Sequence, residues 1–515
     1  MKILCRNPAT LESLGEVPVT TPEEVRGTVA KAREAFAFWS KLSFKERGKQ
    51  LLAARDYIGT HRDEIAAVIT KENGKPLAES ISADIVPVMD LATYFARNAE
   101  KILRREKVWL GKWNFMGRQS FIEFAPLGVV GIIAPWNFPF SIPCGQTIMA
   151  LAAGNTVVLK PAGITSLIGL KIQEIFDAVG LPKGVLTVVT GDSQTGAALV
   201  QAGVQKIIFT GSVGVGRKVM EMASKTLTPV VLELGGKDPM VVLPDADLET
   251  ASSAAVWGAF TNCGQVCASV ERLYLHESIA ESFIQKCVQK TRQLRIGEGI
   301  DPNTDVGPLT NESQLKNVEQ QVESAKREGA KVLVGGNRVT GRNGYFYTPT
   351  ILTNVHHRME VMQEETFGPV LPIMTFKTEE EAIRLANDSR FGLTASVWTK
   401  NIRKGTEIAQ KIEAGTVTVN ENVYTYAVPQ TPWGGPKESG IGRTHGRQGF
   451  LELVEPRHIH INRIAGMKDL WWYSYNESRI KVLKALADLF FVPGLIRRAG
   501  ALVRLIGAMF RIKNV

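Results

Sequence analysis

The 515-residue sequence predicts an α/β protein built around two parallel β-sheets. The chain is too long for one hydrophobic core, since single cores stop growing near ~250–300 residues. Short apolar runs of strand length alternate with helical patterns through most of the chain, as in βαβ units. Its hydrophobic fraction of 44% and charged fraction of 22% are those of an ordinary globular protein.

The first expected element is a helical layer over residues 22–105. Apolar residues recur there at spacings of three and four, for example Val25, Val29 and Ala32, which is the period of an amphipathic helix. An Asn-Gly pair at 73–74 interrupts the pattern as a turn does.

Two α/β regions follow this layer. In the first, buried strands are expected at 129–133, 156–159, 186–189, 206–209 and 230–232, with helices such as 164–179 and 215–224 between them. In the second, from about 238 to 420, strand candidates include 240–243, 272–275, 371–374 and 416–419. Strands alternating with helices form parallel sheets that bind ligands at the carboxyl ends of their strands.

The strongest chemical signal is a glutamate and a cysteine in two glycine-containing motifs. Glu233 lies in Leu-Glu-Leu-Gly-Gly-Lys at 232–237, and Cys267 ends Phe-Thr-Asn-Cys-Gly-Gln-Val-Cys at 260–267. A carboxylate and a thiol can serve as base and nucleophile in covalent catalysis. Taken singly, each has a structural reading, because cysteine is usually a small buried hydrophobe and glutamate often caps or pairs at a strand end.

These two motifs are part of a larger set, through which the chain resembles the aldehyde dehydrogenase superfamily over nearly all of residues 1–465. The other blocks are Ile-Ala-Pro-Trp-Asn-Phe-Pro at 133–139, Val-Leu-Lys-Pro at 158–161, Phe-Thr-Gly-Ser at 209–212 and Glu-Glu-Thr-Phe-Gly-Pro at 364–369. All six occur in the order of that family.

The resemblance implies a division of the chain into four parts. Residues 1–104 and 124–235 would form a Rossmann-like cofactor-binding domain, and residues 236–432 a catalytic domain. Residues 105–123 and 433–465 would form a β oligomerisation arm with its connecting segment, which implies a homo-oligomer, either dimer or tetramer. A helical extension, 466–515, follows.

The resemblance also implies the chemistry. Cys267 would attack an aldehyde carbonyl to give a thiohemiacetal and then a thioester, as an activated thiolate can. The side-chain amide of Asn137 and the backbone N–H of Cys267 would stabilise the oxyanion. Glu233 would activate the water that releases the acid. Because Glu233 follows a buried strand, we expect desolvation to raise its pKa towards neutrality.

A nicotinamide cofactor is implied in the same way. Lys160 would bind the adenosine ribose, Ser212 the pyrophosphate and Glu365 the nicotinamide ribose, and Phe367 would pack near the nicotinamide ring. Trp136, Gly211 and Gly216 complete the expected cofactor site. The glycine-rich segment 211–216 opens a helix, but Val213 departs from the dinucleotide fingerprint, so this segment alone is a weak indication.

One departure from the family bears on the choice of cofactor. Members that prefer NAD often carry a glutamate three positions after the lysine, and Gly163 stands there in this chain. Because no negative charge at that position repels a 2′-phosphate, both NAD and NADP stay open, with NAD slightly favoured.

The expected substrate is apolar. Phe140, Phe260, Cys263 and Val266 are predicted to line the aldehyde tunnel. Gly145 stands where members that take succinic semialdehyde carry an arginine, which disfavours a short charged substrate. These features favour an aldehyde dehydrogenase of long-chain or carotenoid type, with a short-chain or semialdehyde dehydrogenase as the alternative.

Two further hypotheses conflict with the motifs. A CoA-acylating dehydrogenase usually lacks the base, whereas Glu233 is present. An inactive nucleotide-binding scaffold or a membrane-associated structural protein could lose Cys267, Glu233 or Asn137, and the chain retains all three. No metal site is expected, because Cys263 and Cys267 lack nearby partners for a tetrahedral set.

The C-terminal extension differs from the body in charge. After Gly466, nine Lys or Arg oppose three acids, so six of the ten net positive charges lie there. A helical wheel from 495 to 513 places on one face Leu495, Ile496, Ala499, Leu502, Val503, Ile506, Met509 and Phe510. Arg497, Arg504 and Arg511 lie opposite.

A second amphipathic helix is expected over 480–491, separated from the first by a Pro-Gly pair at 493–494. Aromatic residues at 471–473 precede it. The pattern favours peripheral membrane contact through 467–515, with packing on the protein itself as the alternative. No uninterrupted apolar run is long enough to span a bilayer.

The five scattered cysteines suit a reducing compartment, and the start of the chain has no apolar signal segment. We therefore expect a cytoplasmic location. The charge of the body, only four units positive, argues against a nucleic-acid surface there.

Overall fold

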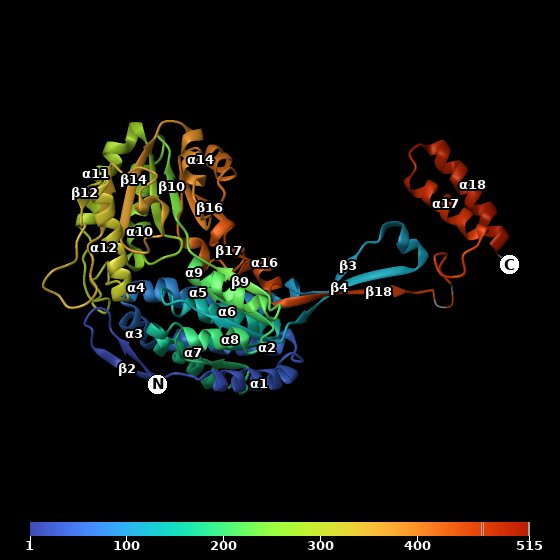
Figure 1. The fold of residues 1–515 in the computed structure, drawn as a ribbon, viewed down its shortest axis with the longest axis horizontal. Helices are drawn as coiled ribbons and strands as arrows, with labels where there is room; N and C mark the ends of the chain where they lie inside the picture. Colours follow the sequence, from blue (N-terminus) through green and yellow to red (C-terminus); the bar gives the residue numbers. More distant parts are fainter. Residues whose placement is uncertain (465, 467, 513–515) are drawn as a thin grey trace. The chain divides into compact units, whose positions relative to one another are not determined.

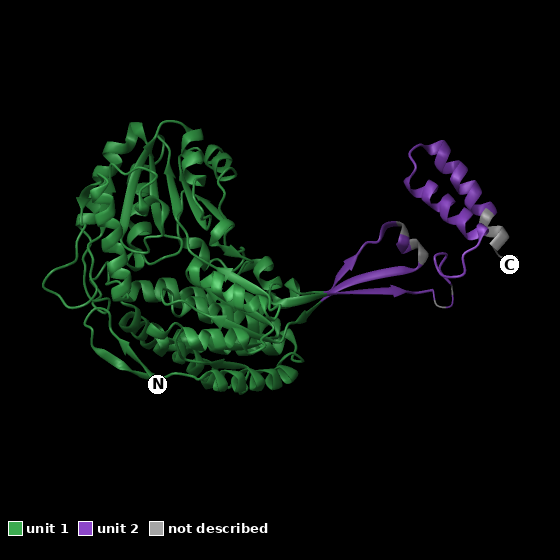
Figure 2. Cartoon of the chain, viewed as in Figure 1, with its two compact units in different colours: residues 1–104, 124–456 green, residues 105–123, 457–515 purple. Residues whose placement is uncertain are grey.

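The computed structural model describes residues 1–464, 466 and 468–512, and for residues 112, 115, 116 and 508–512 it describes the backbone alone. Two compact units are distinguished in Figure 2. Unit 1 comprises residues 1–104 and 124–456, and unit 2 comprises residues 105–123 and the chain from 457 onward. Many of the helices and strands of each unit are labelled in Figure 1.

Helices form between residues 22 and 102, within the sequence range expected for the helical layer. Its main helices are α1 (Pro22–Trp39), α2 (Phe44–Thr60), α3 (Arg62–Asn73) and α5 (Val86–Ile102). Thr21 and Ser43 cap α1 and α2 through capping boxes, which satisfy otherwise unpaired N–H groups. Gly74 ends α3 with a φ of 100°, a left-handed conformation that glycine adopts without strain. A short antiparallel pair, β1 (Lys2–Arg6) and β2 (Ser13–Pro18), precedes the layer.

Unit 1 contains a six-stranded sheet in the order β17-β9-β8-β5-β6-β7. Its parallel strands are β5 (Val129–Ile133), β6 (Thr156–Lys160), β7 (Leu186–Val188), β8 (Lys206–Thr210) and β9 (Val230–Glu233). The edge strand β17 (Gly440–Ile441) pairs antiparallel with β9. The helices between them are α6 (Ser141–Ala153), α7 (Ser166–Ala178), α8 (Ser193–Gln201) and α9 (Val213–Ser224).

Both faces of this sheet are covered, which explains why its strands appear in the sequence as continuous apolar runs. In β5, Val130 and Ile132 pack into a core with α2, α3, α5 and α6. Val129 and Ile133, which point the other way, pack into a second core with α1, α8 and α9.

The second sheet has seven strands in the order β12-β13-β14-β11-β10-β15-β16. Their bounds are β10 (Asp238–Val242), β11 (Val270–His276), β12 (Lys331–Val334), β13 (Thr350–Thr353), β14 (Val370–Phe376), β15 (Thr394–Trp398) and β16 (Thr416–Val419). Only β12 is antiparallel to its neighbour among these described strands. The longer helices here are α10 (Leu248–Phe260), α11 (Ala280–Arg292), α12 (Glu312–Arg327), α14 (Glu379–Asn387) and α15 (Ile402–Ala409). The predicted mixture of two largely parallel sheets is confirmed.

Unit 2 holds a three-stranded sheet and a helical pair. The sheet, in the order β18-β4-β3, consists of β3 (Glu106–Val108), β4 (Arg118–Pro126) and β18 (Val454–Asn462). A 3₁₀ turn at Gly111–Met116 lies between β3 and β4, and Gly117 closes this turn with a φ of 69°. The helical pair is α17 (Glu477–Phe491) and α18 (Leu495–Ile512). None of the helices in the described part of the chain is long and apolar enough to cross a membrane.

Candidate active site

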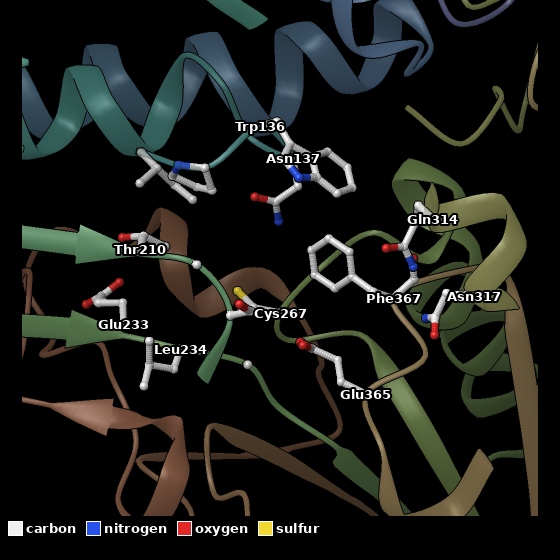
Figure 3. A pocket seen from close by; sticks show the side chains of 15 residues that line it. Trp136, Asn137, Thr210, Glu233, Leu234, Cys267, Gln314, Asn317, Glu365 and Phe367 are labelled. Carbon is white, nitrogen blue, oxygen red and sulfur yellow. The ribbon is translucent and has the colours of Figure 1, made fainter. Parts of the chain in front are cut away.

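A pocket of about 230 Å³ lies in unit 1 where loops from both sheets meet. The segments that follow β5, β8 and β9 form one part of the pocket wall, and the loop before β11 contributes Cys267. Figure 3 shows Asn137, Glu233, Glu365 and Phe367 arranged around Cys267. The lining residues are Pro135, Trp136, Asn137, Ile142, Thr210, Gly211, Ser212, Glu233, Leu234, Gly235, Cys267, Gln314, Asn317, Glu365 and Phe367.

The loop that carries Cys267 depends on its glycines. Gly264 has a φ of 72°, and a Cβ there would lie 2.1 Å from the Gly368 carbonyl oxygen. A Cβ at Gly236 would lie 2.5 Å from the Cys267 carbonyl oxygen. Both distances are far below van der Waals contact, so only glycine lets these segments approach each other. Gly236 therefore lets the 232–237 motif approach the 260–267 motif, and Gly264 lets the 260–267 motif approach the 364–369 motif.

The environment of Cys267 favours the neutral thiol. Burial raises its pKa well above the usual value, and the carboxyl groups of Glu365, Asp238 and Glu233 add to this effect. A thiol in such surroundings needs a nearby base before it can act as a nucleophile.

Glu233 has the properties of such a base. It ends β9, is 4% exposed, and burial raises the pKa of its carboxyl group to about 7. The Thr444 hydroxyl donates a hydrogen bond of 2.7 Å to Glu233 Oε1, which favours the carboxylate. A carboxyl group that titrates near neutral pH can both accept and return a proton.

Thr444 connects Glu233 to a buried histidine. His445 Nδ1 lies 3.0 Å from the Thr444 hydroxyl oxygen. Since the single hydroxyl proton is directed to Glu233, the imidazole must carry its proton on Nδ1 and donate to that oxygen. His445 is 1% exposed, and burial lowers its pKa to about 3, so it is neutral.

Asn137 presents its amide beside Cys267 but is engaged in this arrangement. Its Nδ2 donates a hydrogen bond of 3.0 Å to the Gln265 carbonyl oxygen, two residues before Cys267. Asn262 Nδ2 donates to the backbone carbonyl oxygen of Asn137 at 2.8 Å. The amide is thus held in the loop of the cysteine.

A buried ion pair holds the backbone of the segment that carries Asn137. Lys75 Nζ lies 2.7 Å from Asp84 Oδ2, and both side chains have no exposed surface. Lys75 also donates to the Asn137 carbonyl oxygen at 2.8 Å. The second oxygen of Asp84 accepts the backbone N–H of Ser141 at 2.8 Å, at the start of α6. These contacts fix the segment between β5 and α6 at Asn137 and at the start of the helix that follows it.

The expected cofactor residues cluster on the other wall. Ser212 is the N-cap residue of α9 with an extended backbone, and its side chain makes no capping bond to the helix. A Cβ at Gly216 would lie 2.6 Å from Leu234, so glycine lets α9 pack closely on the sheet. Ser212 lines the pocket, so the N-terminus of α9 is at the pocket wall, and the first N–H groups of a helix are the donors that an anion site needs.

The remaining cofactor candidates lie at strand ends or in the 364–369 motif. Lys160 ends β6, is 7% exposed, and burial lowers its pKa to about 8. Glu365 Oε1 accepts the backbone N–H of Gly236 at 3.2 Å, and burial raises its pKa. The rings of Trp136 and Phe367 meet edge to face at 5.4 Å. Lys160 and Gly216 are absent from the lining of the described pocket, whereas Trp136, Gly211, Ser212, Glu365 and Phe367 belong to it.

Cys267 also packs into a cluster of apolar side chains. Its buried members are Val266, Ala268, Leu393 and Trp433, and packed against them are Phe138, Cys267, Val423 and Tyr426. The Tyr426 and Trp433 rings meet at 5.3 Å in an edge-to-face geometry. We refer to these eight residues as the apolar cluster.

The four residues predicted to line the aldehyde tunnel lie in different clusters of the structure. Val266 belongs to the apolar cluster. Phe140 has no exposed surface and lies in the core under the helical layer. Phe260 and Cys263, 2% and 1% exposed, are in the core of the second sheet because the end of α10 turns them inward.

Several neighbours of the site carried no sequence signal. Thr444, Lys75 and Asp84 are common residue types in unremarkable surroundings, and folding alone brings them to the motifs. Trp433 and Tyr426 lie more than 150 residues after Cys267. The Pro-Trp-Gly-Gly run at 432–435 is the one local feature that could have drawn attention to this stretch.

Comparisons with known proteins agree with this geometry. A family model described as "Aldehyde dehydrogenase family" matches residues 1–459. The chain is 39% identical to a 4,4'-diapolycopene aldehyde oxidase of Methylomonas sp, covering 93% of this chain and 89% of the relative. It is 38% identical to a peroxisomal aminoaldehyde dehydrogenase 1 of Pisum sativum, covering 91% and 93%. A solved betaine aldehyde dehydrogenase of Staphylococcus aureus in complex with NAD+ superimposes with a TM-score of 0.86 at 35% identity, covering 92% and 94%.

Proposed function

The chain belongs to the aldehyde dehydrogenase family, and we propose that it oxidises a long-chain or otherwise apolar aldehyde to the carboxylic acid with NAD or NADP. The observation that carries the apolar substrate is that the partly exposed side chains packed with Cys267 in the apolar cluster, Phe138, Val423 and Tyr426, are hydrophobic or aromatic. An apolar chain gains free energy from leaving water for such a surface, at about 25 cal/mol per Å² buried.

In this proposal the first step belongs to Cys267 and Glu233. The Glu233 carboxylate accepts the thiol proton, directly or through one water, as the sulfur attacks the aldehyde carbon. A carbon–sulfur bond forms, and the carbonyl electron pair moves to oxygen. The pKa of Glu233, about 7, suits this role, because half of the carboxyl groups are ionised at neutral pH.

Asn137 stabilises the oxygen that becomes negative. Its Nδ2, which donates to the Gln265 carbonyl oxygen at 3.0 Å, has a second proton for the oxyanion, and the backbone N–H of Cys267 is the other donor. The Lys75–Asp84 pair keeps the Asn137 backbone in place, so the donor is oriented before the substrate arrives.

Residues in and near the pocket fit a dinucleotide. Within the lining, Ser212 at the α9 N-terminus would offer N–H groups for a pyrophosphate, and Glu365 a carboxyl acceptor for ribose hydroxyls. Lys160, a buried cation at the end of β6, lies outside the lining and would contact the adenosine ribose. When bound, the nicotinamide accepts the hydride of the aldehyde carbon. The product of oxidation is then an acyl thioester on Cys267.

Hydrolysis returns the enzyme to its starting state. Glu233 first releases to solvent the proton that it took from the thiol. As a carboxylate again, it removes a proton from water, whose oxygen attacks the thioester carbon, and Asn137 again binds the oxyanion. The carbon–sulfur bond breaks, the acid leaves and the proton held by Glu233 returns to sulfur. One carboxyl group with a pKa near neutrality therefore serves both half-reactions.

Two features support an uncharged substrate. Gly145 lies fully buried in α6 against Leu91, in a core of hydrophobic side chains, with no cation at that position to pair a substrate carboxylate. The relative named 4,4'-diapolycopene aldehyde oxidase points in the same direction. Relatives named as aminoaldehyde, succinate-semialdehyde and betaine aldehyde dehydrogenases show that the family serves several substrates at similar identity.

A homo-oligomer and a cytoplasmic location are parts of the same proposal. Unit 2 presents a three-stranded sheet with β18 at one edge, and Ile461 on this strand is 40% exposed. An exposed sheet edge can pair with another chain, which supports assembly through this arm. Five cysteines without a disulfide suit a reducing compartment.

The test is turnover of aldehydes of increasing length, from acetaldehyde to hexadecanal, with succinic semialdehyde as the charged control. Each methylene buried at the apolar cluster contributes about 0.8 kcal/mol, so kcat/KM should rise about fourfold per methylene until the cluster is covered. Production of reduced NAD or NADP gives the rates. Flat kcat/KM across the series, or preference for the semialdehyde, would contradict the apolar substrate.

A further inference from the structure

The helical pair of unit 2 buries an unexpected face of α18. Helix α17 packs on α18, and the buried side chains of the pair are Val482, Ala485 and Ala501. An ion pair of 2.9 Å between Arg504 and Asp488 joins the same two faces. An amphipathic helix normally turns its apolar face to its partner, but here α18 contacts α17 through alanine and a charged residue.

The apolar face of α18 points away from α17. Leu495, Ile496 and Val503 are 85%, 89% and 71% exposed, and Leu502 and Ile506 are 46% and 49% exposed. Residues three, four and seven apart share one face of a helix, so these five side chains form one continuous strip, which we call the outer face. The predicted continuation at Met509 and Phe510 lies outside the described side chains.

The outer face is flanked by a basic side chain, the exposed Arg498. Other exposed basic side chains of the helical pair are Arg497, further round α18, and Lys481 and Lys484 on α17. Beyond Gly466 the net charge is six units positive. Before the helices, the rings of Trp471, Trp472, Tyr473 and Tyr475 are 43–83% exposed. Aromatic rings of this kind favour the boundary between lipid and water.

These observations select among the partners that could cover the outer face. A contiguous apolar strip with a polar rim marks an interaction site. Pairing with the same surface of a second copy would bring two sets of six positive charges together, which repel each other. An anionic bilayer offers hydrocarbon for the strip and negative head groups for the basic side chains.

We propose that the outer face of α18 binds the surface of an anionic lipid membrane, with its apolar side chains among the acyl chains and its arginines at the head groups. The helix lies in the plane of the interface. This contact is independent of which aldehyde the enzyme oxidises, so its test and the substrate test can fail separately.

The experiment is flotation of the full-length protein with vesicles. One set contains 70% phosphatidylcholine and 30% phosphatidylglycerol, and the other contains phosphatidylcholine alone. The disrupting variant is Ile496→Asp with Val503→Asp. The matched control is Leu227→Asp with Ile402→Asp, which adds the same charge at unit 1 residues that are 88% and 58% exposed. Turnover of a short soluble aldehyde checks that all proteins are folded.

We expect the wild-type protein and the control to float with anionic vesicles, at least tenfold more than with neutral vesicles, and less in 0.5 M than in 0.1 M salt. The Ile496→Asp, Val503→Asp variant should lose at least nine-tenths of this binding. Three results would overturn the proposal: no flotation of the wild type, equal flotation of the disrupting variant, or salt-independent binding to neutral vesicles. Self-association of the wild type that the disrupting variant abolishes, without lipid binding, would assign the outer face to a second copy instead.

Discussion

Replacing Thr444 by valine should move the acid limb of the activity profile to higher pH. The Thr444 hydroxyl donates a 2.7 Å hydrogen bond to Glu233 Oε1, and valine has the same shape without the donor. A hydrogen bond to the carboxylate favours its charged form and so lowers the pKa of Glu233. Its removal therefore raises that pKa, and a higher pH is needed to generate the base.

The size of this pKa shift follows from the free energy of the lost hydrogen bond. A hydrogen bond to a charged group contributes about 1.5–3 kcal/mol, and 1.36 kcal/mol corresponds to one pKa unit. Starting from a pKa of about 7, the midpoint should move to about 8–9. At pH 7 the ionised fraction of Glu233 then falls from about one half to about 1–10%, so activity should drop about 5- to 50-fold and recover at high pH.

The assay is kcat/KM against pH, because this constant reports the titrating groups of the free enzyme. Thr444→Ser is the matched control, since it keeps the hydroxyl and should keep the midpoint. Thermal unfolding of both variants checks that the loss of the His445 contact has not unfolded the site. An unchanged midpoint in Thr444→Val, or an equal shift in Thr444→Ser, would refute the reasoning.

Three further predictions follow from the same site. Asn137→Ala should lower kcat by about 10²–10³-fold with an unchanged fold, because one oxyanion donor is lost; a loss below threefold would contradict this role. Lys75→Met should destabilise the protein by about 3–5 kcal/mol in urea unfolding, because it leaves the Asp84 charge buried and unpaired. The same substitution at Lys286, in an exposed ion pair, should leave the unfolding midpoint unchanged, and equal effects at both positions would refute the argument. Gly163→Glu should lower kcat/KM for NADP at least tenfold relative to NAD by charge repulsion, since a Cβ there meets only ordinary contacts at 3.4 Å and beyond; an unchanged ratio would contradict it.

The sequence predicts the sheets and the main helices because their signals are local. The strands of the first sheet are buried on both faces, so runs such as 129–133 and 156–159 consist of apolar residues throughout. Helices α1 and α2 begin at the capping residues Thr21 and Ser43, and α3 ends at Gly74, signals that are also visible in the sequence. Interruptions such as the 3₁₀ turn before Gly117 depend on single glycines and were less evident.

The site is less predictable because half of it comes from distant segments. Glu233 and Cys267 could be recognised by their motifs, and the fold brings both to one pocket. Thr444 reaches Glu233 only through the position of its loop, and a threonine has no pattern that announces such a contact. Burial is equally hard to read from the sequence: Phe260, seven residues before Cys267, packs in the core of the second sheet.

The central claim is that Cys267 becomes acylated and that Glu233 directs its release. The most direct measurement is mass spectrometry of Glu233→Gln after reaction with an apolar aldehyde and NAD, followed by protease digestion. The account predicts an acyl group, with the mass of the substrate's acid less water, on the peptide that contains Cys267 and its absence in a Cys267→Ala variant. An acyl group on another peptide, or full turnover by Cys267→Ala, would contradict the account.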